Sequence, residues 1–283
     1  MNSLVDASPR AFEVLNFCAT HRAPLMPLSD DTICLEIGDP GTLDRTKYPQ
    51  IINCFDEAPE THPYRRELAL VAALIAASRF LQRTKVDPET LVNFMTYRLF
   101  VMPFKTEHHA APAQLNFLTP DEVGAYQEHV SPAQASTPFL LPFFFHRERI
   151  EVSYGERHNP AYFPRFMQCA VDEGVLDEFE AEQCRQNVLH LTAMGAGRMP
   201  ARVFCDISDK AEQVVFRFLR DFTPARADEE SFQVALYLYE RLAVYLLEKH
   251  IRDQYAILPR HIFGYWTLVD ENRQHIAGSY ELG

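Results

Sequence analysis

DEESFQVALYLYERLAVYLLEKHIRDQY, residues 228–255, is the stretch that most strongly constrains the fold. Between residues 232 and 247 its strongly polar residues are Gln233, Glu240 and Arg241. On an α-helix these three residues and Glu248 occupy about a third of the circumference, and Val, Leu, Ala and Tyr occupy the remainder. A helix that is apolar around most of its surface has to be covered by other elements. The stretch therefore predicts a buried helix at the centre of the core.

Start signals and apolar spacing predict further helices over most of the chain. Eight prolines directly follow Ser, Thr, Asp or Asn, the residues preferred at a helix N-cap, and proline is favoured at the position after the cap. Six of these pairs are expected to start helices: Ser8-Pro9, Asp87-Pro88, Thr119-Pro120, Ser131-Pro132, Asn159-Pro160 and Thr223-Pro224. The low glycine count of 10 also favours helix. The expected helices cover residues 9–20, 65–83, 88–102, 120–130, 160–173, 177–193, 209–222 and 228–255.

Fewer stretches have the β-branched and aromatic composition of strands. They are residues 32–37, 143–154 and 202–207, and residues 265–282 have the pattern of a hairpin with a polar turn. The predicted fold is an α-rich α+β fold. It has about seven to eight helices around a central C-terminal helix, a small mainly antiparallel sheet and a terminal β-hairpin.

SPAQASTPFLLP, residues 131–142, is the best candidate for a domain boundary. Pro, Ser, Ala and Thr dominate it, and no helical period crosses it. We expect a mainly helical N-terminal half over residues 1–135 and an α+β C-terminal half over residues 136–283. A length of 283 residues is also compatible with one continuous domain.

The composition limits the classes of partner. A net charge of −12 disfavours nucleic acid, because binding it requires Lys and Arg to neutralise phosphates. The longest apolar run, residues 68–77, is about half the ~20 residues of a membrane-spanning helix, and the first residues lack the apolar run of a signal peptide. The six cysteines are scattered without a CxxC pair, which is typical of reduced thiols. We expect a soluble, cytoplasmic protein without a membrane span.

Motifs that would identify a reaction are absent from the sequence. It contains neither of the phosphate-binding patterns GxxxxGK[ST] and GxGxxG, nor the GxSxG pattern of nucleophilic hydrolases. No Glu-x-x-His or His-Glu-x-x-His pattern occurs, so no metal site is predicted. The cofactor, if any, is unknown from the sequence.

RQNVLH, from Arg185 to His190, resembles the R-x4-H pattern of the HEPN ribonucleases. In that family the arginine and the histidine converge at a helical dimer interface and assist RNA cleavage, so the resemblance would imply a nuclease. It covers six residues, and an acidic chain suits RNA poorly. An exposed arginine and a half-buried histidine at the end of a helix is the simpler interpretation.

Two classes of function remain open, and the first is a non-catalytic accessory or regulatory protein. Such a protein would bind a protein partner or a second copy of itself through the aromatic stretch FLLPFFFHRER. Aromatic residues and arginine are enriched in interface hot spots, although core packing would equally explain the phenylalanines. The residues expected to bind the partner are Phe143, Phe144, Phe145, Arg147 and Arg149.

The alternative is an enzyme that acts on a small molecule in a pocket between the two halves. Catalytic residues of many enzymes converge only in three dimensions, so the absence of local motifs does not exclude this class. The polar side chains expected to line such a pocket are Arg157, His158, Arg185, His190 and Asp206.

Overall fold

β1 (Phe12–Thr20) is the strand around which the sheet is built. It pairs in parallel with β2 (Ile33–Glu36) on one side and with β4 (Leu91–Thr96) on the other. β3 (Ile51–Asn53) continues the parallel sheet beyond β2. Every strand in this central part therefore ends at the same edge of the sheet.

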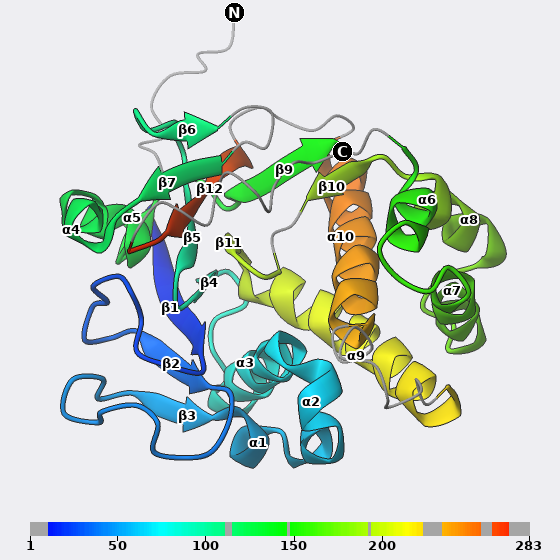
Figure 1. Cartoon of the computed structure of the whole chain (residues 1–283), viewed down its shortest axis with the longest axis horizontal. Coiled ribbons are helices and arrows are strands. Elements are labelled where there is room, and N and C mark those ends of the chain that lie inside the picture. The colour runs from blue at the N-terminus through cyan, green and yellow to red at the C-terminus, as the bar shows by residue number, and fades with distance from the viewer. Residues whose placement is uncertain are drawn as a thin grey trace, which may run out of the picture.

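The computed structural model places these strands between layers of helices (Figure 1). The residues that it describes are 11–110, 115–145, 148–191, 194–222, 234–255 and 262–271. No helix in these ranges is long and apolar enough to cross a membrane.

The remaining strands extend the sheet and make it mixed. The strand order is β10-β9-β12-β5-β4-β1-β2-β3, and β6, β7, β8 and β11 pair with members of this series. β5 is antiparallel to β4 and β12, whereas β12 is parallel to β7 and β9. The bounds are Leu99–Met102 for β5, His109–Ala110 for β6, Leu115–Leu118 for β7, Gln134–Ala135 for β8, Leu141–Phe145 for β9, Leu189–Leu191 for β10, Gly197–Pro200 for β11 and Phe263–Val269 for β12.

Helices cover both faces of the parallel strands. α3 and α9 pack on one face, with α10 against α9, while α4 and α5 contribute to the core on the other face (Figure 1). The α-helices are α1 (Cys54–Glu57), α2 (Arg65–Leu68), α3 (Leu70–Thr84), α4 (Pro120–Val123), α5 (Gln127–Val130), α6 (Ile150–Gly155), α7 (Tyr162–Asp172), α8 (Glu178–Gln186), α9 (Ala201–Asp221) and α10 (Val234–Tyr255), and the 3-10 helices are η1 (Pro59–Tyr64) and η2 (Gly124–Tyr126).

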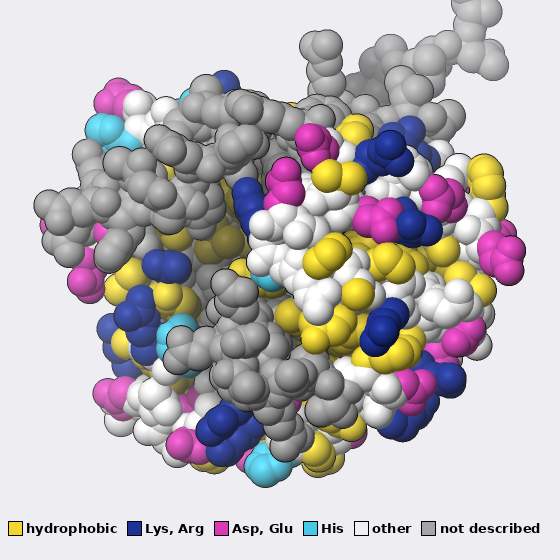
Figure 2. All heavy atoms as spheres, turned by 45° about the vertical axis from the view of Figure 1, so that its right-hand side comes forward, with side chains coloured by type: hydrophobic (Ala, Val, Ile, Leu, Met, Phe, Trp, Pro, Cys, Tyr) yellow, Lys and Arg dark blue, Asp and Glu magenta, His cyan; other side chains and the backbone are white. Residues whose placement is uncertain are grey.

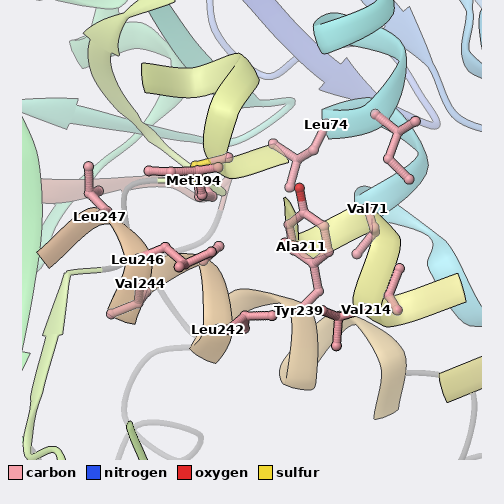
Figure 3. Packing of buried hydrophobic residues seen from close by; sticks show 14 of the residues in the cluster. Val71, Leu74, Met194, Ala211, Val214, Tyr239, Leu242, Val244, Leu246 and Leu247 are labelled. Atoms are coloured by element: carbon pink, nitrogen blue, oxygen red, sulfur yellow. The ribbon is translucent and has the colours of Figure 1, made fainter. Parts of the chain in front are cut away.

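α10 occupies the centre of the larger core. Leu242 and Tyr239 on this helix are fully buried. Figure 3 shows the Tyr239 ring between Leu74 of α3 and the α9 residues Ala211 and Val214. The helix predicted within residues 228–255 is thus present and buried over the α10 bounds, and its predicted first turn lies outside the described residues.

The polar stripe of α10 is buried as well. Arg241 is 7% exposed and Glu248 is 6% exposed. The guanidinium of Arg241 lies over the ring of Tyr154 in α6, and Glu248 accepts a hydrogen bond of 2.8 Å from Asn187, which follows α8. The stripe therefore faces the α6–α8 layer and not the solvent.

Both faces of β1 are buried, and this explains its composition. Phe17 and Ala19 pack into the core formed with α3 and α9, whereas Cys18 packs into a second core with Val123 and Val130. Parallel strands that are covered on both faces consist of apolar runs without alternation. Such a run has no period that distinguishes it from a buried helix.

The predicted fold class is therefore wrong. The chain has a large mixed sheet with a parallel centre, not a small mainly antiparallel sheet in an α-rich fold. Residues 9–20 and 88–102, expected to be helices, contain β1, β4 and β5, and the expected strand at residues 202–207 lies within α9. The first strand of the predicted terminal hairpin is β12, but it pairs with β5 and β7, and residues 274–282 lie outside the described residues.

The larger core contains residues from both predicted halves, for example Phe17 and Leu242. The predicted boundary stretch contains β8, which pairs with β1. Whether the chain divides after residue 135 stays a prediction.

A pair of buried asparagines joins β1 to β4. Asn16 and Asn93 lie opposite each other in the strand register. Asn93 donates its amide to the Asn16 side-chain oxygen at 2.9 Å and to the carbonyl of Val130 at 3.1 Å, and Asn16 donates to the carbonyl of Pro132 at 3.1 Å. Because buried amides need partners, these bonds fix the strand pair to the segment that follows α5.

Replacing Leu242 with alanine is expected to lower the free energy of unfolding by about 2–5 kcal/mol, because it leaves a cavity at the centre of the core. Urea denaturation measures this loss. Phe179→Ala is the control, since Phe179 is 71% exposed and its loss should change stability by about 0.5 kcal/mol or less. A loss below about 1 kcal/mol for Leu242→Ala would show that α10 does not have the central position described above.

Asn93→Ala is expected to cost about 1–3 kcal/mol, because it leaves the side-chain oxygen of Asn16 and the carbonyl of Val130 buried without a donor. The same denaturation measurement applies, with exposed Gln168→Ala as the control. Equal stabilities for the two variants would contradict a role for the asparagine pair.

Candidate functional site

The strand order of the parallel sheet reverses beside β1. The chain passes from β1 to β2 and β3 on one side and returns through α1, η1, α2 and α3 to β4 on the other side. In open α/β sheets, ligands bind outside the carboxyl ends of the strands at such a reversal, because the connecting loops diverge there. The fold therefore favours a ligand beyond Thr20 and Thr96, where β1 and β4 end.

Four residues with cationic or hydrogen-bonding side chains directly follow these two strand ends. His21 and Arg22 follow β1, while Tyr97 and Arg98 form the turn between β4 and β5. The amide of Tyr97 donates to the carbonyl of Ala19 at 3.0 Å, so the two segments are joined through their backbones. We call His21, Arg22, Tyr97 and Arg98 the strand-end cluster.

The ring of Tyr97 is the centre of the strand-end cluster. Arg22 donates from Nη2 to the Tyr97 hydroxyl at 3.0 Å, and its guanidinium carbon lies 4.4 Å from the ring centre. The guanidinium carbon of Arg98 lies 5.4 Å from the same centre, and the His21 ring meets it edge-on at 4.9 Å. Cation–π attraction holds the two arginines near one another despite their like charge.

The strand-end cluster carries positive charge that no carboxylate neutralises within the described ranges. Neither Arg22 nor Arg98 forms an ion pair there. Burial, followed by the charges of Arg22 and Arg98, lowers the pKa of His21, so its imidazole is neutral at pH 7. Guanidinium groups bind phosphate and carboxylate oxygens, and a neutral imidazole can accept a proton. The cluster is therefore suited to an anionic ligand.

The neighbouring strand ends use their polar side chains to shape loops. Glu36, at the end of β2, is 1% exposed and accepts hydrogen bonds from the amides of Gly41 at 3.2 Å and Leu43 at 3.1 Å. Asn53, at the end of β3, accepts a bond of 3.0 Å from the amide of Phe55 and so caps α1. Within the described residues, no three His, Cys, Asp or Glu side chains are grouped to hold a metal ion.

The five predicted catalytic residues lie on different elements. Arg157 and His158 follow α6, Arg185 is in the last turn of α8, and Asp206 is on α9. His190 is on β10, and its side chain lies outside the described residues. Only Arg157 and His158 belong to one segment, and the catalytic roles of all five stay predictions.

Arg185 and Asp206 have partners within the fold. Arg185 donates from Nε and Nη2 to the two carboxylate oxygens of Glu151, each at 2.9 Å, and so joins α8 to α6. Asp206 accepts a bond of 2.8 Å from Lys210, one turn further along α9. These ion pairs explain the positions of both side chains without a ligand. The Arg185–Glu151 pair gives the arginine of RQNVLH a structural partner.

His158 lies between aromatic rings. Its ring stacks on Tyr237 of α10 at 4.5 Å between centres and lies 4.9 Å from the ring of Tyr154 in α6. Burial, followed by the charges of Arg241 and Arg157, lowers the pKa of His158 to about 4. The imidazole is therefore neutral and packed at pH 7.

The residues predicted to bind a partner are only partly described. Phe143 is half-buried in β9 and packs against the Phe263 ring at 4.5 Å between centres, while Arg149 is exposed before α6. Phe144 and Phe145 continue β9, but their side chains lie outside the described residues, as does Arg147. A partner site at this stretch stays a prediction.

A polar groove of about 490 Å³ lies between α8 and α10. Its side chains bind one another: Lys249 pairs with Glu180, and the hydroxyl of Tyr245 donates to Gln183 at 3.1 Å. Both helices belong to the predicted C-terminal half, so this groove does not lie between the two predicted halves.

The strand-end cluster is absent from the predicted site residues, although the sequence contains a signal for it. Residues 16–22 read NFCATHR and residues 93–98 read NFMTYR. Both runs begin with Asn-Phe and end with Thr, a ring-bearing residue and Arg, and the parallel pairing aligns Asn16 with Asn93. Recognising the two runs as neighbouring parallel strands would have located the cluster.

The pKa of His158 predicts a loss of stability in acid. The unfolded chain takes up the proton near the ordinary pKa of 6.5, whereas the folded chain does so near 4. Between these values the unfolded state binds more protons, so the free energy of unfolding falls as the pH decreases through this window. His158→Phe keeps the ring stacking and should reduce the fall by about 1–2 kcal/mol, allowing for partial solvent screening.

Urea denaturation between pH 7 and pH 4 measures this difference. The exposed His62→Phe variant serves as a control and should retain the pH profile of the wild type. An unchanged profile for His158→Phe would mean that His158 titrates normally in the folded protein.

Comparison with known proteins gives one informative similarity. No model of a protein family and no curated protein matches the chain. Among solved structures, it is similar to the apo structure of WbbM, a bifunctional glycosyltransferase, with a TM-score of 0.67 and 12% sequence identity. The similarity covers 91% of this chain and 45% of that chain, so this chain spans less than half the length of the protein that it resembles.

This similarity contradicts the prediction of a non-catalytic accessory or regulatory protein. Nearly the whole chain adopts a fold that is found in an enzyme, which favours the alternative prediction of an enzyme. At this level of identity the finding concerns the fold: the chain has the α/β architecture of a solved glycosyltransferase structure.

Proposed function

We propose that this chain is an enzyme that transfers a glycosyl group from a phosphate-activated sugar to an acceptor hydroxyl. In this proposal the donor phosphate binds at the strand-end cluster. The supporting observation is that Arg22 and Arg98 flank Tyr97 at the reversal of strand order, without an ion-pair partner among the described residues. The similarity to a glycosyltransferase structure supports the class of reaction.

Glycosyl transfer requires positive charge where the leaving group departs. The bond between the anomeric carbon and the phosphate oxygen breaks, and its electron pair stays on the phosphate. Arg22 and Arg98 would bind the phosphate oxygens and stabilise this charge more strongly in the transition state than in the bound donor. The ring of Tyr97 would keep the two guanidinium groups oriented before the donor arrives.

The acceptor hydroxyl loses a proton as its oxygen bonds to the anomeric carbon. In the proposal this proton passes to the imidazole of His21, which is packed on one side against Tyr97 and open to solvent on the other. Its lowered pKa leaves the imidazole neutral and able to accept a proton at pH 7.

We also propose a cytoplasmic location, on the basis of the thiols. All six cysteines are free, and five of them are buried. Burial raises the pKa of Cys34 to about 12 and that of Cys184 to about 12, so these thiols are unreactive packing groups. Such thiols are typical of proteins in a reducing compartment.

A protein partner or a second copy of the chain remains part of the proposal. Val152 on α6 is 42% exposed and Val188 after α8 is 42% exposed, and Figure 2 shows apolar side chains between charged ones on the side that carries α6, α7 and α8. The net charge of −12 continues to disfavour nucleic acid.

The test is to incubate the protein with nucleotide-activated sugars, measure release of the nucleotide, and measure donor binding by calorimetry. Arg22→Ala and Arg98→Ala should each weaken donor binding about tenfold, the effect of losing one charged hydrogen bond to phosphate. Arg98→Lys should retain more affinity than Arg98→Ala, because it keeps the charge.

Arg202→Ala is the matched control. Arg202 is an exposed arginine on α9, paired with Glu89 at 2.7 Å, and its loss should leave donor binding unchanged. Melting temperatures of all variants show whether they are folded. Failure of every activated sugar to bind, or equal affinity in the wild type and both alanine variants, would refute the proposed function.

A further inference from the structure

Arg241 on α10 and two neighbouring side chains each have a buried polar atom without a hydrogen-bond partner. These atoms are Nε of Arg241, Nδ1 of His158 and the hydroxyl of Tyr154, and none has a partner within the described part of the chain. Buried polar groups in folded proteins are nearly always paired with protein, water or a ligand. Three such atoms on neighbouring side chains therefore mark a place for a bound water or ligand.

The three side chains come from two parts of the fold and meet at one place. The guanidinium carbon of Arg241 lies 5.2 Å from the centre of the Tyr154 ring. The rings of Tyr154 and His158 are 4.9 Å apart, and His158 stacks on Tyr237, one turn before Arg241 on α10. Helices α6 and α10 thus hold the three side chains next to one another.

No ion pair neutralises the guanidinium of Arg241 within the described residues. Arg241 is 7% exposed and donates from Nη1 to the carbonyl of Tyr237 at 2.9 Å, but it forms no ion pair with a described carboxylate. The adjacent Glu240 is the acidic residue that acts on it, and burial raises the pKa of that carboxyl group. Arg157 adds further positive charge beside Arg241 and His158. Burying an unpaired guanidinium is costly, so an anion would stabilise it.

We infer that Arg241, His158 and Tyr154 form a binding site for a compact oxyanion, such as inorganic phosphate or the phosphate group of a small molecule. All three atoms can donate a hydrogen bond: Nε of arginine, Nδ1 of the appropriate neutral imidazole tautomer and the tyrosine hydroxyl. The oxygens of a phosphate accept several such bonds at once, and charge-assisted bonds from arginine are the strongest of them.

This site is separate from the strand-end cluster and does not depend on the proposed function. It is built from α6, the residues after it and α10, whereas the strand-end cluster follows β1 and β4. It also gives His158, expected from the sequence to line a functional pocket, a role in binding an anion without acid–base chemistry.

The experiment measures the melting temperature with and without about 20 mM inorganic phosphate, at constant ionic strength with chloride as the replacement. Binding with a millimolar dissociation constant should raise the melting temperature of the wild type by roughly 2–5 °C. Tyr154→Phe removes only the hydroxyl and should at least halve this rise, and Arg241→Met should remove most of it. If Arg241→Met does not fold, Tyr154→Phe and His158→Phe carry the test.

The Arg22→Ala, Arg98→Ala double variant removes the other candidate phosphate site and should keep most of the rise, because it leaves α6 and α10 intact. Phosphate should also shift the imidazole nitrogen resonance of His158 in the nuclear magnetic resonance spectrum of the wild type. No rise in the wild type would mean that the three atoms bind water. An equal rise in Tyr154→Phe, His158→Phe and the wild type would mean an adventitious ion only, and loss of the rise in the double variant would place the phosphate at the strand ends. Each of these three outcomes overturns the inference.

Discussion

The parallel pairing of β1 with β2 and β4 is the constraint on which the rest of the structure depends. β1 has partner strands at both edges and apolar cores on both faces. Because neither face is in contact with solvent, helices must cover both of them. The register is equally restricted, because a slip of one residue would exchange the environments of Phe17 and Cys18. Asn16 and Asn93 bond only in the observed register. That register also brings the ends of β1 and β4 level and assembles the strand-end cluster.

The sequence predicted those elements whose patterns have a single interpretation. The α10 helix, the helix ending near residue 83 and the strand within residues 32–37 all occur. β1 and β4 could not be identified by period, since strands buried on both faces and buried helices have the same apolar composition. Proline after an N-cap residue was also an ambiguous signal: Thr119-Pro120 begins α4, but Asp87-Pro88 lies in a turn before β4. The strand-end cluster required the pairing of β1 with β4, which no local pattern specifies.

α10 has two structural roles, and the residues for both lie on the same helix. Its apolar residues fill the core between α3 and α9, and its polar stripe faces α6 and α8. A buried Arg241 costs stability compared with an apolar residue of the same size. Natural proteins retain such costly groups mainly where function needs them, as an anion site would. The same helix therefore combines the centre of the larger core with a group that destabilises it.

The position of β12 has a consequence for how the protein is made. β12 lies between β5 and β9 in the sheet, although it is the last described strand in the chain. At about 5–20 residues per second, a ribosome needs roughly 10–30 s to synthesise the segment between β5 and β12. During that time β5 has an open edge that can pair with other chains. The nascent chain would thus depend on protection from aggregation until β12 emerges, and its yield in a cell would be set by the ribosome and chaperones as much as by the stability of the finished fold.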